Sequence, residues 1–122
     1  HLVDYVDPTT GESVVPTLSF RSQLLRPGDK TRPKRMTASA VYCVLDGAGK
    51  TEVAGRTLAW ERNDIFFVPG WMWRSFENTG TGDAILYSVC DEPAQRKLAL
   101  FRAQGKDAAD ALVDIARWPD FD

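Results

Sequence analysis

Cysteine, histidine and long apolar runs are all scarce in this sequence, and each scarcity excludes a class of protein. The two cysteines, Cys43 and Cys90, lie far apart in strand-like contexts, so we expect neither a disulfide framework nor a Cys-x-x-Cys metal site. We interpret both as small buried hydrophobic residues. No apolar run approaches the roughly 20 residues of a membrane-spanning helix, and no secretory signal pattern opens the chain. The expected location is the cytoplasm.

A strong charge of either sign is also lacking. The formal net charge of -2 gives no reason to expect a nucleic acid or membrane partner. The stretch 26–35 is the local exception, because it carries five basic residues against Asp29 alone. We interpret most of these charges as a solvated loop, with Lys34 set apart for the reasons below.

The residues that are present predict a globular all-β domain. The 122 residues are 43% hydrophobic and 26% charged, which is typical of one folded domain. Short segments rich in β-branched and aromatic residues alternate with Gly, Pro and Asn turns, as in a sandwich or barrel built of antiparallel hairpins. Gly47 and Gly55 are placed to supply the positive φ of tight reversals. We expect strands at residues 17–25, 38–45, 50–53, 56–60, 64–68, 73–77 and 84–90.

The residue periodicity becomes helical after Cys90. Asp91 or Glu92 can cap a helix whose first turn contains Pro93, and Ala94, Leu98 and Phe101 would share its buried face. A second helix is predicted over residues 107–117 from the apolar stripe of Ala108, Ala111, Leu112 and Ile115.

We therefore divide the chain into residues 1–16, leading in from a preceding domain, a barrel at 17–91, and a helical segment at 92–122 that packs on the barrel. The start at His1 suggests a segment excised from a larger protein.

Two stretches carry a recognisable spacing of turn residues around four inward positions. The first pattern is Gly, five residues, His-x-His, a short gap, Glu, six residues and Gly; the second is Gly, five residues, Pro, a short gap, His, three residues and Asn. These paired signatures are those of the cupin superfamily, which this chain resembles. The first maps onto Gly28, Lys34, Met36, Ala40 and Gly47, and the second onto Asn63, Pro69, Arg74 and Asn78.

The resemblance is narrower than the superfamily over about Tyr5 to Arg102. The most specific sequence motifs are T-x-S-A-V-Y at residues 37–42 and V-P-x-W-x-W at 68–73. The segments GRTLAW and DAILYSVCDEP add to the resemblance. They are similar to the C-terminal cupin of gentisate 1,2-dioxygenase and its salicylate and 1-hydroxy-2-naphthoate dioxygenase relatives. The resemblance implies a double-stranded β-helix, or jelly-roll barrel, with one or two C-terminal helices. It also implies a two-cupin oxidoreductase of aromatic compound catabolism that assembles into homo-oligomers, commonly tetramers. Fe(II), held by three histidines of the N-terminal cupin, would serve to open the ring of a hydroxylated aromatic acid with dioxygen.

The four positions that would hold a metal in this domain are all changed. Lys34 and Met36 stand for the two histidines of the first signature, Ala40 for its glutamate, and Arg74 for the histidine of the second. Positions two apart on a strand face the same side, so these side chains should point inward together. Two cations offer no lone pair to a hard metal ion, and His1 is a single ligand at the far end of the chain. We expect no metal and no catalytic residue in this segment.

Two interpretations of Lys34 and Arg74 stay open at this stage. They could form an anion pocket for a small carboxylate. Alternatively, Arg74 fills the vacated metal space beside an acid such as Glu52 or Glu77, or against an indole. We favour the second, because two buried cations without counter-charges would be costly.

The aromatic residues of the second half are expected mainly to pack the core. Arg74 and Phe76 should face the interior by parity, whereas Trp73 and Trp71 should face outward and are our candidates for an interface with a partner domain or subunit. The set comprises Trp60, Trp71, Trp73, Phe66, Phe67 and Phe76.

The leading hypothesis is a non-catalytic half of a gentisate-type dioxygenase, inactive alone, whose partner is the N-terminal cupin of the same chain. The same role in a salicylate or 1-hydroxy-2-naphthoate dioxygenase is the first alternative. A stand-alone metal-free cupin that binds a small carboxylate, and a purely structural dimerisation module, are hypotheses of other classes.

Overall fold

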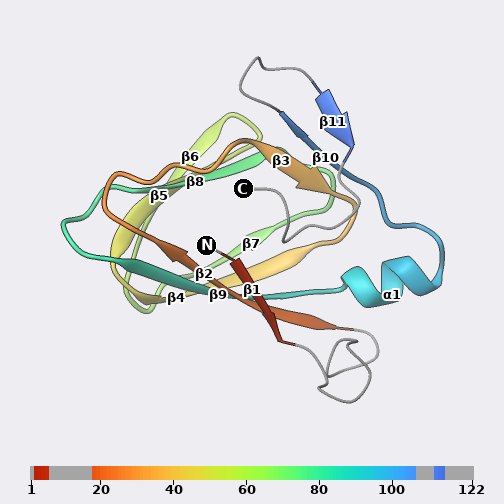
Figure 1. Cartoon of the computed structure of the whole chain (residues 1–122), viewed down its shortest axis with the longest axis horizontal. Helices are drawn as coiled ribbons and strands as arrows, with labels where there is room; N and C mark the ends of the chain where they lie inside the picture. Colours follow the sequence, from red (N-terminus) through yellow and green to blue (C-terminus); the bar gives the residue numbers. More distant parts are fainter. Residues whose placement is uncertain (1, 6–17, 107–111, 115–122) are drawn as a thin grey trace.

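Two antiparallel β-sheets face each other and enclose one core (Figure 1). The computed structural model describes residues 2–5, 18–106 and 112–114. The first sheet has the order β1 (Leu2–Tyr5), β2 (Ser19–Leu25), β9 (Ala84–Cys90), β4 (Ala40–Asp46) and β7 (Ile65–Val68). The second has the order β11 (Leu112–Asp114), β10 (Ala103–Lys106), β3 (Lys34–Met36), β8 (Arg74–Asn78), β5 (Ala48–Val53) and β6 (Arg56–Glu61). The predicted all-β architecture is confirmed.

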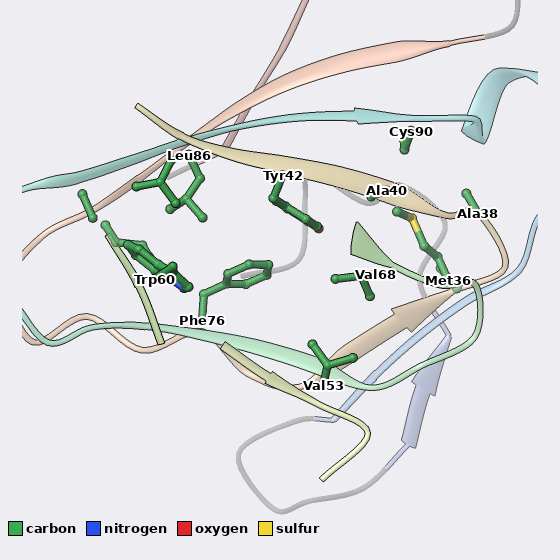
Figure 2. Close-up of a cluster of buried hydrophobic side chains, with 14 of the residues drawn as sticks. Met36, Ala38, Ala40, Tyr42, Val53, Trp60, Val68, Phe76, Leu86 and Cys90 are labelled. Atoms are coloured by element: carbon green, nitrogen blue, oxygen red, sulfur yellow. The ribbon is translucent and has the colours of Figure 1, made fainter. Parts of the chain in front are cut away.

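Strict alternation in the central strands builds the core. Every second residue of β2 and β9 is buried and the residues between are half-buried, as expected where side chains point alternately to the two faces of a sheet. The inward apolar side chains come from both sheets (Figure 2). Tyr42 and Phe76 meet at 5.0 Å between ring centroids, and the Trp60 indole N–H donates to the Thr51 hydroxyl at 2.9 Å.

All seven predicted strands occur, six of them with shifted ends, and the structure differs from the prediction in two further respects. The strand expected at 38–45 begins at Ala40, and a separate short strand, β3, precedes it. The reversal expected at Gly47 is not a hairpin, because β4 and β5 belong to different sheets and Gly47, at φ 85°, lies at the crossing. Ala54 and Gly55, at φ 50° and 80°, do close the hairpin of β5 and β6.

The C-terminal segment differs more from the sequence prediction. Helix α1 (Glu92–Lys97) follows Asp91 and has Pro93 in its first turn, but it ends before Leu98, whose side chain is 68% exposed. Ala99, at φ 58°, turns the chain away, so the predicted helical face through Leu98 and Phe101 is wrong.

The second predicted helix, over 107–117, is wrong at residues 112–114, which form β11 against β10. Residues 107–111 and 115–117 lie outside the described part. A short apolar stripe is marginal as a helix, whereas the backbone groups of β10 require partners on both sides. Residues 2–5, expected to lead in from a preceding domain, pair with β2.

Among the described residues, no helix is long and apolar enough to cross a membrane.

Candidate functional site

The inner faces of the two sheets surround a small cavity. Its volume is about 10 Å³, and side chains of β2, β3, β4, β8 and β9 contribute to its walls. Most of them come in pairs two residues apart on one strand, which is the inward parity of a β-strand. The lining residues are Arg21, Gln23, Lys34, Met36, Ala40, Tyr42, Phe76, Ser88 and Cys90.

Three of the four positions predicted from the signatures line this cavity. Lys34 and Met36 extend inward from β3 and Ala40 from the start of β4, and all three are buried. Arg74 lies directly opposite Lys34 in the pairing of β3 with β8 and is 1% exposed. Its Nη1 donates a hydrogen bond to the Tyr42 hydroxyl at 2.9 Å, so the fourth position contacts a residue that lines the cavity. Sequence analysis did not single out Tyr42.

These residues do not fit the iron that the fold family implies. Lys34 and Arg74 present N–H donors rather than lone pairs, Ala40 presents no donor atom, and Met36 offers only a thioether, a soft ligand. Within residues 2–5, 18–106 and 112–114, no three His, Cys, Asp or Glu side chains are grouped to hold a metal ion. His1 lies outside the described residues. We therefore derive no metal chemistry from this cavity.

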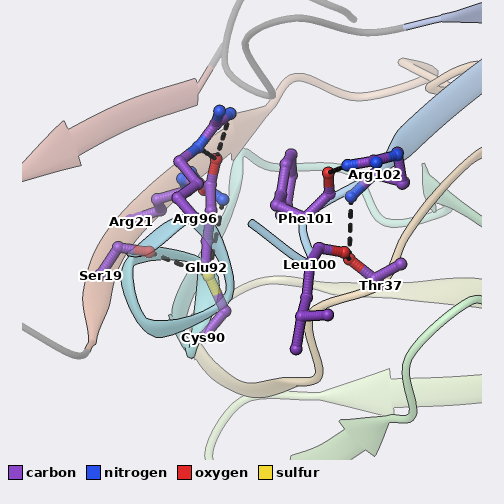
Figure 3. A network of polar contacts seen from close by, with 9 residues as sticks. All are labelled: Ser19, Arg21, Thr37, Cys90, Glu92, Arg96, Leu100, Phe101 and Arg102. Atoms are coloured by element: carbon purple, nitrogen blue, oxygen red, sulfur yellow. Dashed lines mark hydrogen bonds and ion pairs between the residues drawn. The ribbon is translucent and has the colours of Figure 1, made fainter. Parts of the chain in front are cut away.

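Sequence analysis missed a buried ion-pair network at the edge of the cavity (Figure 3). Arg21 of β2 pairs with Glu92 of α1, both with side chains less than a tenth exposed. Arg96 binds the second oxygen of Glu92 at 2.8 Å. Cys90 lies 3.6 Å from Arg21 Nη1 and 2.9 Å from the Ser19 hydroxyl.

The missed signal lies in β2, where Ser19, Arg21 and Gln23 share the buried parity while Phe20 and Leu24 are half-buried. Apolar residues occur at both parities of this strand, so only the register decides which set faces inward.

Cys43 and Cys90 are both free thiols, and they differ in burial. Cys90 belongs to the core as predicted, whereas Cys43 is half-buried, at the opposite parity to the buried residues of β4.

The turn residues of the signatures have structural roles. Asn78 is buried, and its side-chain amide donates to the carbonyls of Leu25 and Gly82 at 2.9 and 2.8 Å. Asn63 has φ 74°, the left-handed conformation that asparagine adopts more readily than most residues. Gly28, at φ 84°, occupies the third position of a turn that Asp29 N closes on Arg26 O at 2.9 Å. These three residues therefore serve the backbone geometry of the turns.

The outward-facing indoles are stacked on a cation. The Arg35 guanidinium lies 4.2 Å from the ring centroid of Trp71 and 4.5 Å from that of Trp73. Lys106 Nζ lies 5.0 Å from the Trp73 ring, and Arg35 Nη2 donates to Gln104 at 2.7 Å. Trp60 and Phe76 are in the core with Phe66 against it, while Phe67 is 56% exposed.

The chain belongs to the cupin family, because the Cupin domain model matches residues 22–90, more than half of its length. It is 44% identical over 100 residues to a 5-aminosalicylate 1,2-dioxygenase of Comamonas sp, a match that covers 82% of this chain and 26% of that protein. It is 35% identical to gentisate 1,2 dioxygenase 1 of Aquipseudomonas alcaligenes, over 82% of this chain and 28% of that one. The chain thus spans about a quarter of the length of these curated relatives.

Solved structures agree on the fold. The salicylate 1,2-dioxygenase of Pseudaminobacter salicylatoxidans is 33% identical with a TM-score of 0.80, over 85% of this chain and 29% of that chain. The Cnp3 cupin domain of Schizosaccharomyces pombe, 17% identical with a TM-score of 0.66 over 81% of this chain and 70% of that one, supports the fold alone. The expected cupin double-stranded β-helix is confirmed, with one C-terminal helix in the described part of the chain.

Proposed function

We propose that this chain is the non-catalytic, C-terminal cupin half of an oxidoreductase that opens the ring of a hydroxylated aromatic acid with dioxygen. One observation carries the proposal: the positions that would bind metal converge on a buried cavity and hold Lys34, Met36 and Ala40 instead, with Arg74 opposite Lys34. The likeness to 1,2-dioxygenases, over about a quarter of their length, supports a companion domain in the same protein.

Iron belongs in the companion N-terminal cupin under this proposal. Fe(II) bound there would supply joint activation of the aromatic acid and dioxygen, and none of its ligands would come from residues 18–106. This half would contribute a rigid barrel and contacts to its partner. Its two sheets share one continuous buried cluster, which supports a structural role.

Gentisate is the substrate we propose for the whole protein. The relatives named as gentisate 1,2-dioxygenases support it, while the relatives named for 5-aminosalicylate and 1-hydroxy-2-naphthoate keep salicylates and hydroxynaphthoate as alternatives. The residues of this half do not discriminate among them, because its cavity is far smaller than an aromatic acid.

We also propose a cytoplasmic homo-oligomer. The two free thiols support a reducing compartment. Trp71, 39% exposed on the outer face, is the candidate contact with the companion cupin domain.

The test compares this 122-residue chain with the longer protein that contains it, each reconstituted anaerobically with Fe(II). Metal analysis and oxygen uptake with gentisate, salicylate and 1-hydroxy-2-naphthoate should give iron and turnover in the longer protein and neither in this chain. Stoichiometric iron on this chain would contradict the proposal, as would a longer protein that holds none.

A variant in which the four cupin ligand positions carry metal-binding side chains makes that test more specific. The combined substitutions Lys34→His, Met36→His, Ala40→Glu and Arg74→His place imidazole and carboxylate ligands on the cavity, which Co(II) absorption would report as a new site. The single substitution Lys30→His, on an exposed side chain, is the control and should bind no Co(II).

A further inference from the structure

One side of the barrel carries large apolar side chains on its outer surface. Four of them, from β4 and β7, lie at the parity opposite to the buried residues and are between 43% and 70% exposed: Val41, Leu45, Ile65 and Phe67. Val41 lies opposite Phe67 in the pairing of these strands, and the half-buried Cys43 lies opposite Ile65. These five side chains form one continuous patch, which we call the β4–β7 face.

The same surface continues without charge across the first sheet. The outward positions of β2 and β9 are half-buried, and none of them holds a charged residue. Strand β7 is apolar at all of its positions, which is typical of strands that are buried on both faces. An antiparallel sheet with one face in water instead alternates apolar and polar residues. The composition of the first sheet therefore indicates that its outer face is covered.

The second sheet provides an internal comparison. The outward positions of β5, β6 and β8 hold mainly charged and hydroxyl side chains, among them Lys50, Glu52, Thr57, Glu61 and Glu77. Both sheets enclose the same core, so folding of this chain does not require their outer faces to differ. Because charges are costly to bury without partners, the outer face of these three strands suits water, whereas the β4–β7 face suits an apolar neighbour.

The size of the apolar surface favours one kind of neighbour. The strands β2, β9, β4 and β7 are adjacent; at a spacing of about 4.8 Å and a length of about 20 Å, they present roughly 400 Å². A contact would thus bury roughly 800 Å² on both partners, within the range of about 600 to 1,500 Å² for domains of one polypeptide. Proteins that associate independently typically bury about 1,600 Å². The area therefore favours a linked domain over a second copy.

The relatives contain enough additional chain to form such a neighbour. The match covers 26% of the 5-aminosalicylate 1,2-dioxygenase and 28% of gentisate 1,2 dioxygenase 1, so most of each relative lies outside it. A domain joined by a linker is present at high effective concentration, which stabilises a contact of modest area. Trp71 stacks on Arg35, at the outward parity of β3 in the second sheet, and is a separate contact surface.

We propose that the β4–β7 face is the docking surface for the companion cupin domain of the same polypeptide, which presents an apolar sheet face to it. The inference rests on the proposed function, because it requires that companion domain. Packing sheet on sheet removes the apolar side chains of both domains from water. It also covers β7, an edge strand paired only with β4, which would otherwise be open to association with other chains.

The first experiment measures thiol labelling in the longer protein that contains this chain. Ile65→Cys places a thiol on the β4–β7 face, and Thr57→Cys places one at an exposed position of the second sheet as the matched control. We expect the thiol at position 65 to react about tenfold more slowly than the control, because a covered thiol reacts only when the contact opens. In this chain position 65 is 70% exposed, so equal labelling rates would overturn the proposal.

A photoreactive side chain identifies the occupant. Phe67, replaced by p-benzoylphenylalanine in the longer protein, should crosslink to a peptide outside these 122 residues in a product that keeps the mass of one polypeptide on a denaturing gel. The same replacement of Thr57 is the control and should give no such product. A product of doubled mass in its place would identify a second copy as the occupant. Crosslinks confined to these 122 residues would exclude the companion domain, and either result overturns the proposal.

Iron content and oxygen uptake of the same protein separate this inference from the proposed function. Slow labelling at position 65, with a crosslink to the companion domain, supports the docking surface even if the protein holds no iron, a result that contradicts only the proposed function. Conversely, a protein with iron and turnover, in which positions 65 and 57 react at equal rates, overturns the docking surface alone.

Discussion

The two ends of the barrel interior are built in opposite ways. Trp60 and Leu86 fill the space between the sheets at one end, and Met36, Ala38, Ala40 and Cys90 lie at the other (Figure 2). Three of the latter, Met36, Ala40 and Cys90, line the small cavity together with charged and polar side chains. Small side chains leave unfilled volume, whereas a buried indole fills it and brings only one N–H, which Thr51 accepts. The apolar end therefore contributes stability through packing, while the polar end depends on a charge network.

The largest effect is expected at the apolar end. Trp60→Ala removes a side chain that is 4% exposed and should lower the free energy of unfolding by about 3 to 5 kcal/mol, measured by urea denaturation. Trp71→Ala, at a position 39% exposed, is the control and should cost far less. Equal losses at the two positions would contradict the division between core and surface indoles.

A somewhat smaller loss is expected at the polar end, where the result depends on removing one partner or both. Glu92→Leu leaves Arg21 buried without its carboxylate and should cost about 3 kcal/mol. Replacing both partners, Arg21→Met with Glu92→Leu, should restore much of that loss, since a well-packed apolar pair is often as stable as a buried ion pair. A double-mutant cycle measures the coupling free energy. Additive losses would indicate that the pair does not act as a unit.

The smallest effect is expected outside the barrel, where cations are stacked rather than enclosed. Arg35→Ala removes the guanidinium between Trp71 and Trp73 and should lower the free energy of unfolding by about 0.5 to 1 kcal/mol, with a change in tryptophan fluorescence. Arg56→Ala, on an exposed arginine of β6, should change neither. A loss as large as that of Glu92→Leu would show that the outer stack matters as much as the buried network.

Much of the barrel could be predicted because its signals are local. Turn residues and alternating apolar residues located all seven expected strands, and β9 has its predicted bounds. Short strands without an apolar pattern were missed: β3 reads Lys-Arg-Met, and β10 reads Ala-Gln-Gly-Lys. Both exist because neighbouring strands complete their hydrogen bonds, which is not a property of their own residues.

The sequence by itself determined the all-β class, the turns and the replacement of the cupin metal-ligand residues by Lys34, Met36, Ala40 and Arg74. These depend on side-chain type and on spacing within one segment. The tertiary structure decided what surrounds those positions, because Arg21, Tyr42 and Ser88 come from segments distant in the chain and become neighbours only when β2, β9 and β4 pair in one sheet. It also decided that residues 112–114 form a strand, since an unpaired edge of β10 outweighs the weak preference of a short helical stripe.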